Sequence, residues 1–220
     1  MASLARPFFP LPCLMLVTDR SRSHLPLPEA VARAVAGGVN VVQLREKDLP
    51  ARDLLALALA LRRVTAGRAL LLVNDRADVA LAAGADGVHL PERGLPVAEA
   101  RRLLGPGRLV GRSVHSPDEA ARAEAEGADY VVAGPVYPTP SHPDALPAGP
   151  GLIARVREAV RVPVLAIGGV TAATVPEALA AGASGVAVIS AILDSDDPEA
   201  AAMALRHALD AAWAEVGYRR

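Results

Sequence analysis

The sequence is poor in several features, and each absence excludes a class of protein. It has a single cysteine, Cys13, so an intrachain disulfide framework is excluded and a reducing compartment is expected. The net charge is −1, which argues against a surface that binds nucleic acid or anionic membrane. No uncharged apolar run is long enough to cross a bilayer. We therefore expect a cytoplasmic protein that binds neither nucleic acid nor membrane.

Lysine and side-chain amides are also scarce, and two of the few that remain lie close together. Lys47 is the one lysine among 23 basic residues, Gln43 is the one glutamine, and Asn40 and Asn74 are the two asparagines. Such depletion is typical of a GC-rich genome or a thermophilic source. Lysine offers a compact, adjustable ammonium that arginine does not match. The segment from Gln43 to Lys47 is therefore the first candidate for a functional site.

A pattern that is present four times joins a helix end, a glycine and a short β-branched run. The copies span residues 36–42, 83–89, 126–132 and 181–187, and they begin 47, 43 and 55 residues apart, about two strand–helix units each. Glycine just after a helix supplies the left-handed conformation that ends it. The β-branched runs are typical of parallel strands that are buried on both faces.

Eight strands are predicted once the gaps between these copies are filled. They lie near residues 14–17, 39–43, 69–73, 86–90, 108–112, 129–133, 163–167 and 185–189. Helical segments at 52–66, 96–104, 117–126, 150–160, 173–181 and 197–214 separate most of them. Eight alternating units predict an α/β protein, a (β/α)8 TIM barrel forming a single domain over residues 1–220.

A doubly wound open sheet is the structural alternative to the barrel. It usually has fewer units, and no G-x-G-x-x-G follows the first predicted strand. The helix predicted over 197–214 has apolar positions that suit packing on the barrel or on a partner, and packing on the barrel is favoured. A homodimer stays open at this point.

Polar side chains follow the apolar strands, at the end of a barrel where substrates bind. Gly168-Gly169 follows the seventh predicted strand and Ser190 follows the eighth, which is where barrel phosphate sites commonly form. Glycines let backbone N–H groups approach an anion, and a helix N-terminus adds a favourable dipole. The alternative is that the two glycines only make a tight turn.

Two cations follow the second predicted strand. Arg45 and Lys47 suit an anionic group, and Gln43 can form hydrogen bonds to a heterocycle or a phosphate. The alternative is a surface cluster of Lys47 with Glu46 and Asp48, which would be of small energetic value.

Asn74 and Asp75 follow the third predicted strand. Their oxygens suit Mg²⁺, and they could equally bind a substrate amine. The alternative is that one of them caps the next helix, as is common at such a junction.

The histidines divide into structural and chemical candidates. His89 lies inside an apolar strand and His115 lies just after Ser113, and a structural role is favoured for both. His142 lies in the proline-rich stretch 134–149, which resembles a mobile active-site loop. A loop can carry a side chain over the mouth, so His142 is the candidate for proton transfer. The alternative is that His142 is solvated and has no chemical role.

These motifs together resemble the thiamine phosphate synthase / thiazole tautomerase superfamily, over residues 14–192. The markers are Gln43-Leu44-Arg45-Glu46-Lys47, Val73-Asn74-Asp75-Arg76, Gly111-Arg112-Ser113-Val114-His115-Ser116, Gly127-Ala128-Asp129-Tyr130-Val131, Ala166-Ile167-Gly168-Gly169 and Val188-Ile189-Ser190-Ala191-Ile192. The resemblance implies a phosphorylated thiazole as the small-molecule substrate. Its phosphate would be held, on the wall opposite Gln43 to Lys47, by Gly168, Gly169, Ile189 and Ser190. The remaining substrate contacts would come from Gln43, Arg45, Lys47, Asn74, Asp75, Ser113, Thr139 and Ser141.

The synthase branch joins a pyrimidine pyrophosphate to thiazole phosphate with Mg²⁺, and this chain departs from its pattern in two places. Gly94 stands where an aspartate metal ligand ends a His-Leu-Gly-Gln-x-Asp pattern, and His142 stands where a lysine ends a Thr-x-Thr-Lys grip on pyrophosphate. The loss of one carboxylate and one cation would weaken a magnesium–pyrophosphate site. Glu92 as a substitute ligand stays open.

The tautomerase branch is similar at the Leu90-Pro91 step and at Ser113 to Ser116. It moves a proton on a carboxylated thiazole phosphate and needs no metal. Pro135 stands where that branch has its histidine proton shuttle, so His142 is the candidate for that role. The alternative is that the substrate carboxylate or a water transfers the proton.

Three functions are therefore carried forward. The first is a metal-independent thiazole phosphate tautomerase without a cofactor. The second is a divergent thiamine phosphate synthase with Mg²⁺ bound at Asp75. The third is a binder of thiazole phosphate or thiamine phosphate that has no activity.

Overall fold

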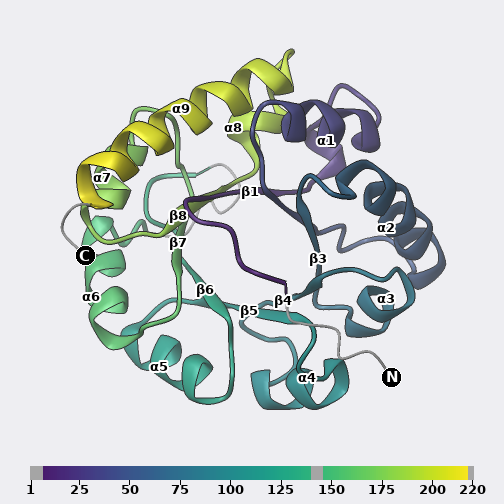
Figure 1. The fold of residues 1–220 in the computed structure, drawn as a ribbon, viewed down its shortest axis with the longest axis horizontal. Coiled ribbons are helices and arrows are strands. Elements are labelled where there is room, and N and C mark those ends of the chain that lie inside the picture. The colour runs from purple at the N-terminus through teal and green to yellow at the C-terminus, as the bar shows by residue number, and fades with distance from the viewer. Residues whose placement is uncertain (1–6, 140–145, 218–220) are drawn as a thin grey trace.

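A computed structural model describes residues 7–139 and 146–217 and contains a closed barrel of eight parallel strands. Neighbours in the chain are neighbours in the barrel, and β8 closes it against β1 (Figure 1). The strands are β1 (Cys13–Val17), β2 (Val41–Leu44), β3 (Leu70–Asn74), β4 (Gly87–Leu90), β5 (Leu109–Val114), β6 (Tyr130–Ala133), β7 (Val164–Ile167) and β8 (Gly185–Val188). The predicted TIM barrel is confirmed.

Helices surround the barrel on the outside (Figure 1). They are α1 (Leu27–Ala36), α2 (Ala51–Thr65), α3 (Ala77–Ala82), α4 (Val97–Leu104), α5 (Pro117–Ala125), α6 (Pro150–Ala159), α7 (Val175–Ala180), α8 (Ser190–Leu193) and α9 (Pro198–Gly217), and a 3₁₀ turn, η1 (Arg20–Arg22), follows β1. Every strand and helix bound given above from the sequence agrees with the structure to within three residues. As expected, α9 packs on the barrel, against α1 and α7. Within the described residues, no helix is both long and apolar enough to cross a membrane.

The recurring glycine pattern builds the same helix end four times. Gly38, Gly84, Gly127 and Gly182 all have a positive φ, between 61° and 106°. In the second copy, the N–H of Gly84 donates to Leu81 and the N–H of the next residue, Ala85, donates to Ala80. The other three copies repeat this arrangement, which matches the left-handed C-terminal cap predicted from the sequence. The cap turns the chain from the helix into the following strand.

In three of the four copies, the second residue after the cap glycine also ties two strands together at the N-terminal end of the barrel. Asn40 Oδ1 accepts a hydrogen bond of 2.9 Å from the N–H of Leu14 in β1. Asp86 Oδ2 accepts one of 2.8 Å from Leu71 in β3, and Asp129 Oδ2 accepts one of 2.7 Å from Val110 in β5. Each of these side chains therefore fixes the register of the strand that precedes its own.

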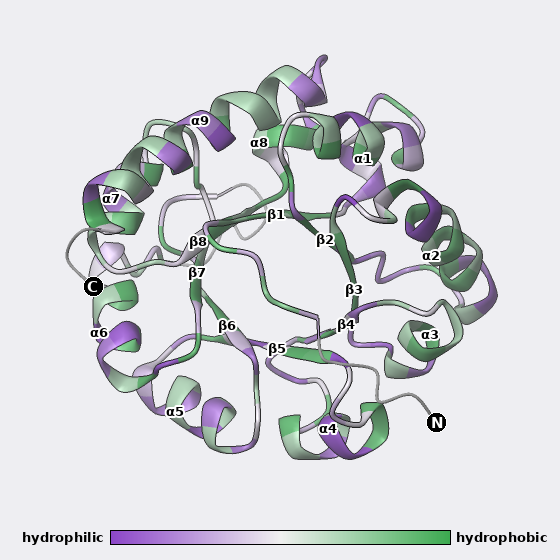
Figure 2. Cartoon of the chain, in the orientation of Figure 1, coloured by the Kyte–Doolittle hydropathy of each residue, from purple (hydrophilic) through white to green (hydrophobic). Residues whose placement is uncertain are grey.

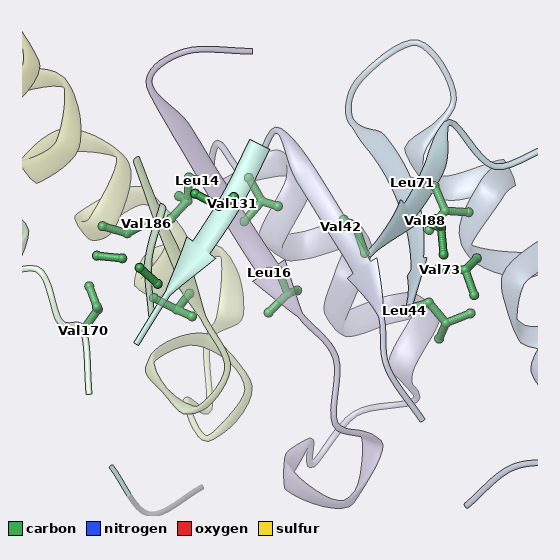
Figure 3. Packing of buried hydrophobic residues seen from close by; sticks show 14 of the residues in the cluster. Leu14, Leu16, Val42, Leu44, Leu71, Val73, Val88, Val131, Val170 and Val186 are labelled. Carbon is green, nitrogen blue, oxygen red and sulfur yellow. The ribbon is translucent and has the colours of Figure 1, made fainter. Parts of the chain in front are cut away.

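Two apolar layers lie on the two faces of the strands. In β1, Leu14 and Leu16 point outward to the layer between strands and helices, which Figure 3 shows at close range. Cys13, Met15 and Val17 point inward and fill the barrel. Most of the strands are green in Figure 2, whereas the purple stretches are concentrated on the helices and loops. Burial on both faces explains why the strands are apolar without alternation.

An aromatic pair closes the N-terminal end of the barrel. The segment before β1 crosses the centre of the ring of strands, where it is purple in Figure 1. Phe9 of this segment stacks on Tyr130 of β6, with 4.5 Å between the ring centroids. Both rings are buried, so this end of the barrel is a packed core.

Candidate active site

The carboxyl ends of the strands surround a cavity of about 940 Å³. Every strand places a side chain in its wall: Val17, Gln43, Asn74, His89, Ser113, Val132, Ile167 and Ala187, from β1 to β8 in order. The polar members come from β2 to β5, which are consecutive around the barrel, and the apolar members come from β6, β7, β8 and β1. The cavity therefore has a polar half and an apolar half.

The structure brings together most of the residues that the sequence predicts for the site. Gln43, Arg45, Lys47, Asn74, Asp75, Ser113, Thr139, Gly168, Gly169, Ile189 and Ser190 all line this one cavity. Ser141 and His142 lie outside the described residues. Their predicted roles therefore stay predictions.

Arg20 holds both acidic neighbours of the cation pair Arg45 and Lys47. Its guanidinium donates to Glu46 Oε2 at 3.1 Å and to Asp48 Oδ1 at 2.6 Å. Glu46 is buried and also accepts a 2.7 Å hydrogen bond from the Thr18 hydroxyl. The backbone N–H of Arg45 donates to the same hydroxyl at 2.9 Å. The predicted alternative of a Lys47–Glu46/Asp48 surface cluster is therefore wrong.

Arg45 and Lys47 consequently carry positive charge into the cavity without a counter-ion among the described residues. Within the part of the chain that the structure describes, neither side chain forms an ion pair. The nearby Arg45 guanidinium, with a smaller contribution from burial, lowers the pKa of Lys47. An anion placed between the two cations would relieve their repulsion. The arrangement is suited to a phosphate or pyrophosphate group.

Asp75 has a strained backbone and faces the cavity. Its φ is 63°, the one positive value at a non-glycine position in the described chain. The turn is held because the N–H of Asp75 donates to His89 O at 2.8 Å and the N–H of Arg76 donates to Asn74 O at 2.7 Å. The next helix, α3, begins after Arg76, so the predicted alternative of a cap by Asn74 or Asp75 is wrong. Strain of this kind is found where a side chain must be aimed.

Gly94 lies beside the Asp75 carboxylate. A Cβ atom added to Gly94 would lie 2.7 Å from Asp75 Oδ1. An aspartate in this position, as in the synthase pattern, would therefore sit next to Asp75. Glu92 is nearby on the same loop and also lines the cavity. Arg112 holds that loop by donating to the carbonyls of Glu92 and Leu95.

Close packing requires glycine at Gly168 and Gly169, whether or not an anion binds there. Both have positive φ, 91° and 65°. A Cβ atom would lie 2.7 Å from Pro135 Cβ at Gly168 and 2.3 Å from Pro138 O at Gly169. The tight-turn alternative is thus correct for the backbone, and it is compatible with a phosphate site because both residues line the cavity beside the start of α8.

The phosphate cup, defined as Gly168, Gly169, Ile189 and Ser190, is not opposite the cation pair. The cup lies at the ends of β7 and β8, and the cations follow β2, so only β1 separates β8 from β2. The expectation that the cup lies on the opposite wall is wrong. The strand opposite β7 is β3, which positions Asn74 and Asp75.

His89 is a buried residue with both ring nitrogens bonded, as the structural interpretation requires. Nδ1 lies 3.0 Å from the Tyr130 hydroxyl and Nε2 lies 2.9 Å from Ser113 Oγ. Burial, followed by the charges of Arg112 and Arg45, lowers the pKa of His89 to about 3. The ring is therefore neutral at physiological pH.

His115, in the loop after β5, contacts two other loops at the rim of the cavity. Its Nδ1 is 2.6 Å from Gly134 O, and its backbone N–H donates to Glu119 Oε2 at 2.7 Å. Its Nε2 lies 3.8 Å from Glu92 Oε2. These contacts support the predicted structural role, because they connect the loops after β4, β5 and β6.

Comparison with known proteins decides the family. The model of the thiamine monophosphate synthase family (TMP-TENI) matches residues 14–192. The chain belongs to this family. A thiamine-phosphate synthase of Methanoculleus marisnigri is 54% identical over 209 residues, which cover 92% of this chain and 97% of that protein. One of Chlorobium luteolum is 46% identical over 197 residues, covering 88% and 91% of the two chains.

A solved structure agrees with this assignment. The thiamine phosphate pyrophosphorylase of Pyrococcus furiosus superposes with a TM-score of 0.84 and 38% identity, over 91% of this chain and 96% of that one. These relatives favour the synthase branch of the family, so the preference for the tautomerase branch drawn from Leu90-Pro91 and Ser113 to Ser116 is corrected. Those stretches lie at the ends of β4 and β5 and in the loops that follow.

Several residues of the site are not predicted from the sequence. Arg20 lies 26 residues before Glu46, and Tyr130 lies 41 residues after His89. The Arg-rich composition conceals Arg20 and Arg93 among the many arginines of the chain. Arg76 and Tyr130 belong to the family markers quoted above, but those markers do not show that Arg76 lines the cavity or that Tyr130 bonds to His89.

Proposed function

We propose that this protein is a thiamine phosphate synthase, which joins a pyrimidine pyrophosphate to thiazole phosphate and releases pyrophosphate. The names of its relatives support the activity. The observation that carries the proposal is the cation pair, Arg45 and Lys47, which Arg20 keeps free of its acidic neighbours. Together with the phosphate cup, this pair gives one cavity two places for anions, as two phosphorylated substrates require.

In this proposal the cup holds the phosphate of the thiazole. Gly168 and Gly169 expose backbone N–H groups to the cavity because neither has a side chain. Ser190 begins α8, and the first N–H groups of a helix have no partner within it. Backbone N–H groups of this kind bind a phosphate without requiring a charged side chain.

The pyrophosphate of the other substrate lies between Arg45, Lys47 and the loop after β6, where Thr139 lines the cavity. Negative charge grows on pyrophosphate as it leaves, and fixed cations stabilise that charge. By its place in the synthase pattern, His142 belongs with Thr139 and Ser141 in this grip rather than to proton transfer.

The residues beside this position fit Mg²⁺ bound together with pyrophosphate. Mg²⁺ is commonly held by one or two carboxylates, with phosphate oxygens and water completing its shell. Asp75 supplies one carboxylate, Asn74 adjoins it, and Glu92 lines the same cavity. Within the described residues, no three side chains of the His, Cys, Asp and Glu types form a metal-binding group, so phosphate oxygens would have to supply part of the shell. When bound, Mg²⁺ would neutralise the leaving pyrophosphate.

The floor of the cavity orients the heterocycles. Gln43 and Ser113 are polar groups of its polar half, and Val132, Ile167 and Ala187 form much of its apolar half. A flat ring with polar atoms along one edge matches this division, since its apolar face displaces water from the β6–β8 side. The same displacement strengthens the charge interactions of Arg45 and Lys47.

The proposal is tested by incubating the protein with both substrates and following thiamine phosphate and pyrophosphate. We expect the two products to form in equal amounts, to stop with EDTA and to resume with excess Mg²⁺. Turnover of the carboxylated thiazole phosphate alone, unaffected by EDTA, would instead establish the tautomerase. Thermal stabilisation by thiazole phosphate without turnover in either assay would establish a binder.

A further inference from the structure

A chain of three side chains runs from the core of the barrel to the cavity. The Tyr130 hydroxyl lies 3.0 Å from His89 Nδ1, and His89 Nε2 lies 2.9 Å from Ser113 Oγ. Tyr130 is fully buried under Phe9, His89 is buried in β4, and Ser113 lines the cavity. These three side chains therefore connect the closed end of the barrel to the cavity.

Each bond in this chain has a direction, and burial determines it. Within the described residues, the Tyr130 hydroxyl has one hydrogen-bond partner, His89 Nδ1. If Nδ1–H donated to Tyr130, the phenol proton would be buried without an acceptor, which costs about 1–3 kcal/mol. The phenol therefore donates, and Nδ1 accepts. A neutral imidazole that accepts at one nitrogen carries its proton on the other.

The consequence appears at Ser113. His89 Nε2–H donates to Ser113 Oγ, which leaves the single hydroxyl proton of Ser113 without an acceptor in the part of the chain that the structure describes. We propose that Tyr130 and His89 are positioning residues that set this direction, so that Ser113 meets the substrate as a hydrogen-bond donor. The substrate atom at Ser113 is then an acceptor, either a heteroaromatic ring nitrogen or a phosphate oxygen. The identity of the substrate rests on the proposed function, whereas the direction of the bonds does not.

The direction is tested first without turnover, by ¹⁵N NMR of histidine-labelled protein. His89 is assigned as the signal pair that is lost in His89→Gln. We expect its ring in the wild type to be a single tautomer with the proton on Nε2. A proton on Nδ1, or a ring that is protonated at neutral pH, would overturn the proposal whatever the enzyme does.

Tyr130→Phe removes only the hydroxyl that sets the direction. We expect the His89 signals to move toward a mixture of tautomers in this variant. Tyr137→Phe is the matched control, because its hydroxyl donates to Glu177 and does not contact His89. Unchanged His89 signals in Tyr130→Phe, with the fold intact, would show that Tyr130 does not set the tautomer.

Kinetics then connect the direction to the substrate. Ser113→Ala identifies the substrate whose KM depends on Ser113. The inhibition constant of inorganic pyrophosphate as a competing ligand then separates a phosphate contact from a ring contact. Tyr130→Phe should raise the KM for that same substrate by about threefold to tenfold, which is the loss of one hydrogen bond. An effect on the other substrate alone would contradict the proposal.

A pair of His89 variants separates positioning from packing. His89→Gln keeps an N–H donor near the Nε2 position, whereas His89→Leu keeps comparable volume without a donor. We expect His89→Gln to retain most of the affinity and His89→Leu to match Ser113→Ala. Equal losses in both His89 variants would mean that the ring only fills space.

Discussion

At the N-terminal end of the barrel, Asp86 and Asp129 each accept a backbone N–H and pair with an arginine, Arg62 and Arg101 respectively. At the mouth, Arg45 and Lys47 face the cavity without a carboxylate partner in the described chain. Basic side chains are therefore paired with aspartate at the closed end, whereas at the mouth they are left for a ligand.

The difference follows from what each end must do. Charges at the closed end are partly buried and would be costly if unpaired, so each has a protein partner. At the mouth, an internal partner would compete with the substrate. Arg20 prevents that competition by occupying Glu46 and Asp48. Substitutions at the closed end should therefore reduce stability, and those at the mouth should reduce activity.

The largest effect is expected for Asp75→Asn. Asparagine tolerates the positive φ of this position, so the turn should survive, but the carboxylate for Mg²⁺ is lost. We expect kcat for pyrophosphate release to fall by about a hundredfold. Asp118→Asn, an exposed change in α5, is the control and should have no effect. Full activity of Asp75→Asn would remove this carboxylate from the proposed site.

Asp129→Asn is the matched change at the closed end. The Val110 N–H and the Arg101 guanidinium both donate to Asp129 Oδ2, so an asparagine oxygen can still accept them, but the negative charge that pairs with Arg101 is lost. We expect the free energy of unfolding to fall by about 2 kcal/mol, with kcat unchanged. Urea denaturation followed by an assay of the folded protein measures both. A loss of activity without a loss of stability would show that the closed end serves catalysis, contrary to the comparison.

The barrel and the position of the site are predictable from the sequence because they depend on local patterns. Apolar runs, glycine stops and polar residues just after each run place Gln43, Asn74 and Gly168 without knowledge of contacts. Arg20 and Tyr130 escape prediction because their partners are set by strand register across 26 and 41 residues. Local patterns also do not decide between the synthase and tautomerase branches. Gly94 stands where the synthase has a metal ligand, and Pro135 stands where the tautomerase has its histidine.

Arg20→Gln should disturb the mouth more mildly than Asp75→Asn. It releases Asp48 and removes the positive charge that pairs with Glu46, so both carboxylates can then attract Arg45 and Lys47. We expect a weaker affinity for inorganic pyrophosphate, by several fold, and a Tm lower by a few degrees. Calorimetric titration and a thermal melt give the two values. An unchanged affinity would mean that the ion pairs of Arg20 with Glu46 and Asp48 stabilise only the fold.

The smallest expected effect is a pH dependence from Lys47. Arg45 lowers the pKa of Lys47, so its ammonium loses the proton at a lower pH than an ordinary lysine. Pyrophosphate affinity should therefore fall as pH rises through this lowered pKa. Lys47→Arg should abolish the fall because guanidinium stays charged, and Arg45→Gln should shift it to higher pH. Identical pH profiles in all three proteins would exclude Lys47 from the anion site.

The most direct test is of the claim that the closed end serves stability and the mouth serves activity. It measures Mg²⁺-dependent pyrophosphate release per folded molecule in Asp75→Asn and Asp129→Asn side by side. The account predicts that release is nearly lost in the first, which stays as stable as the wild type, and is retained in the second, which is less stable. Equal release by the two variants, or release that persists in EDTA, would contradict it.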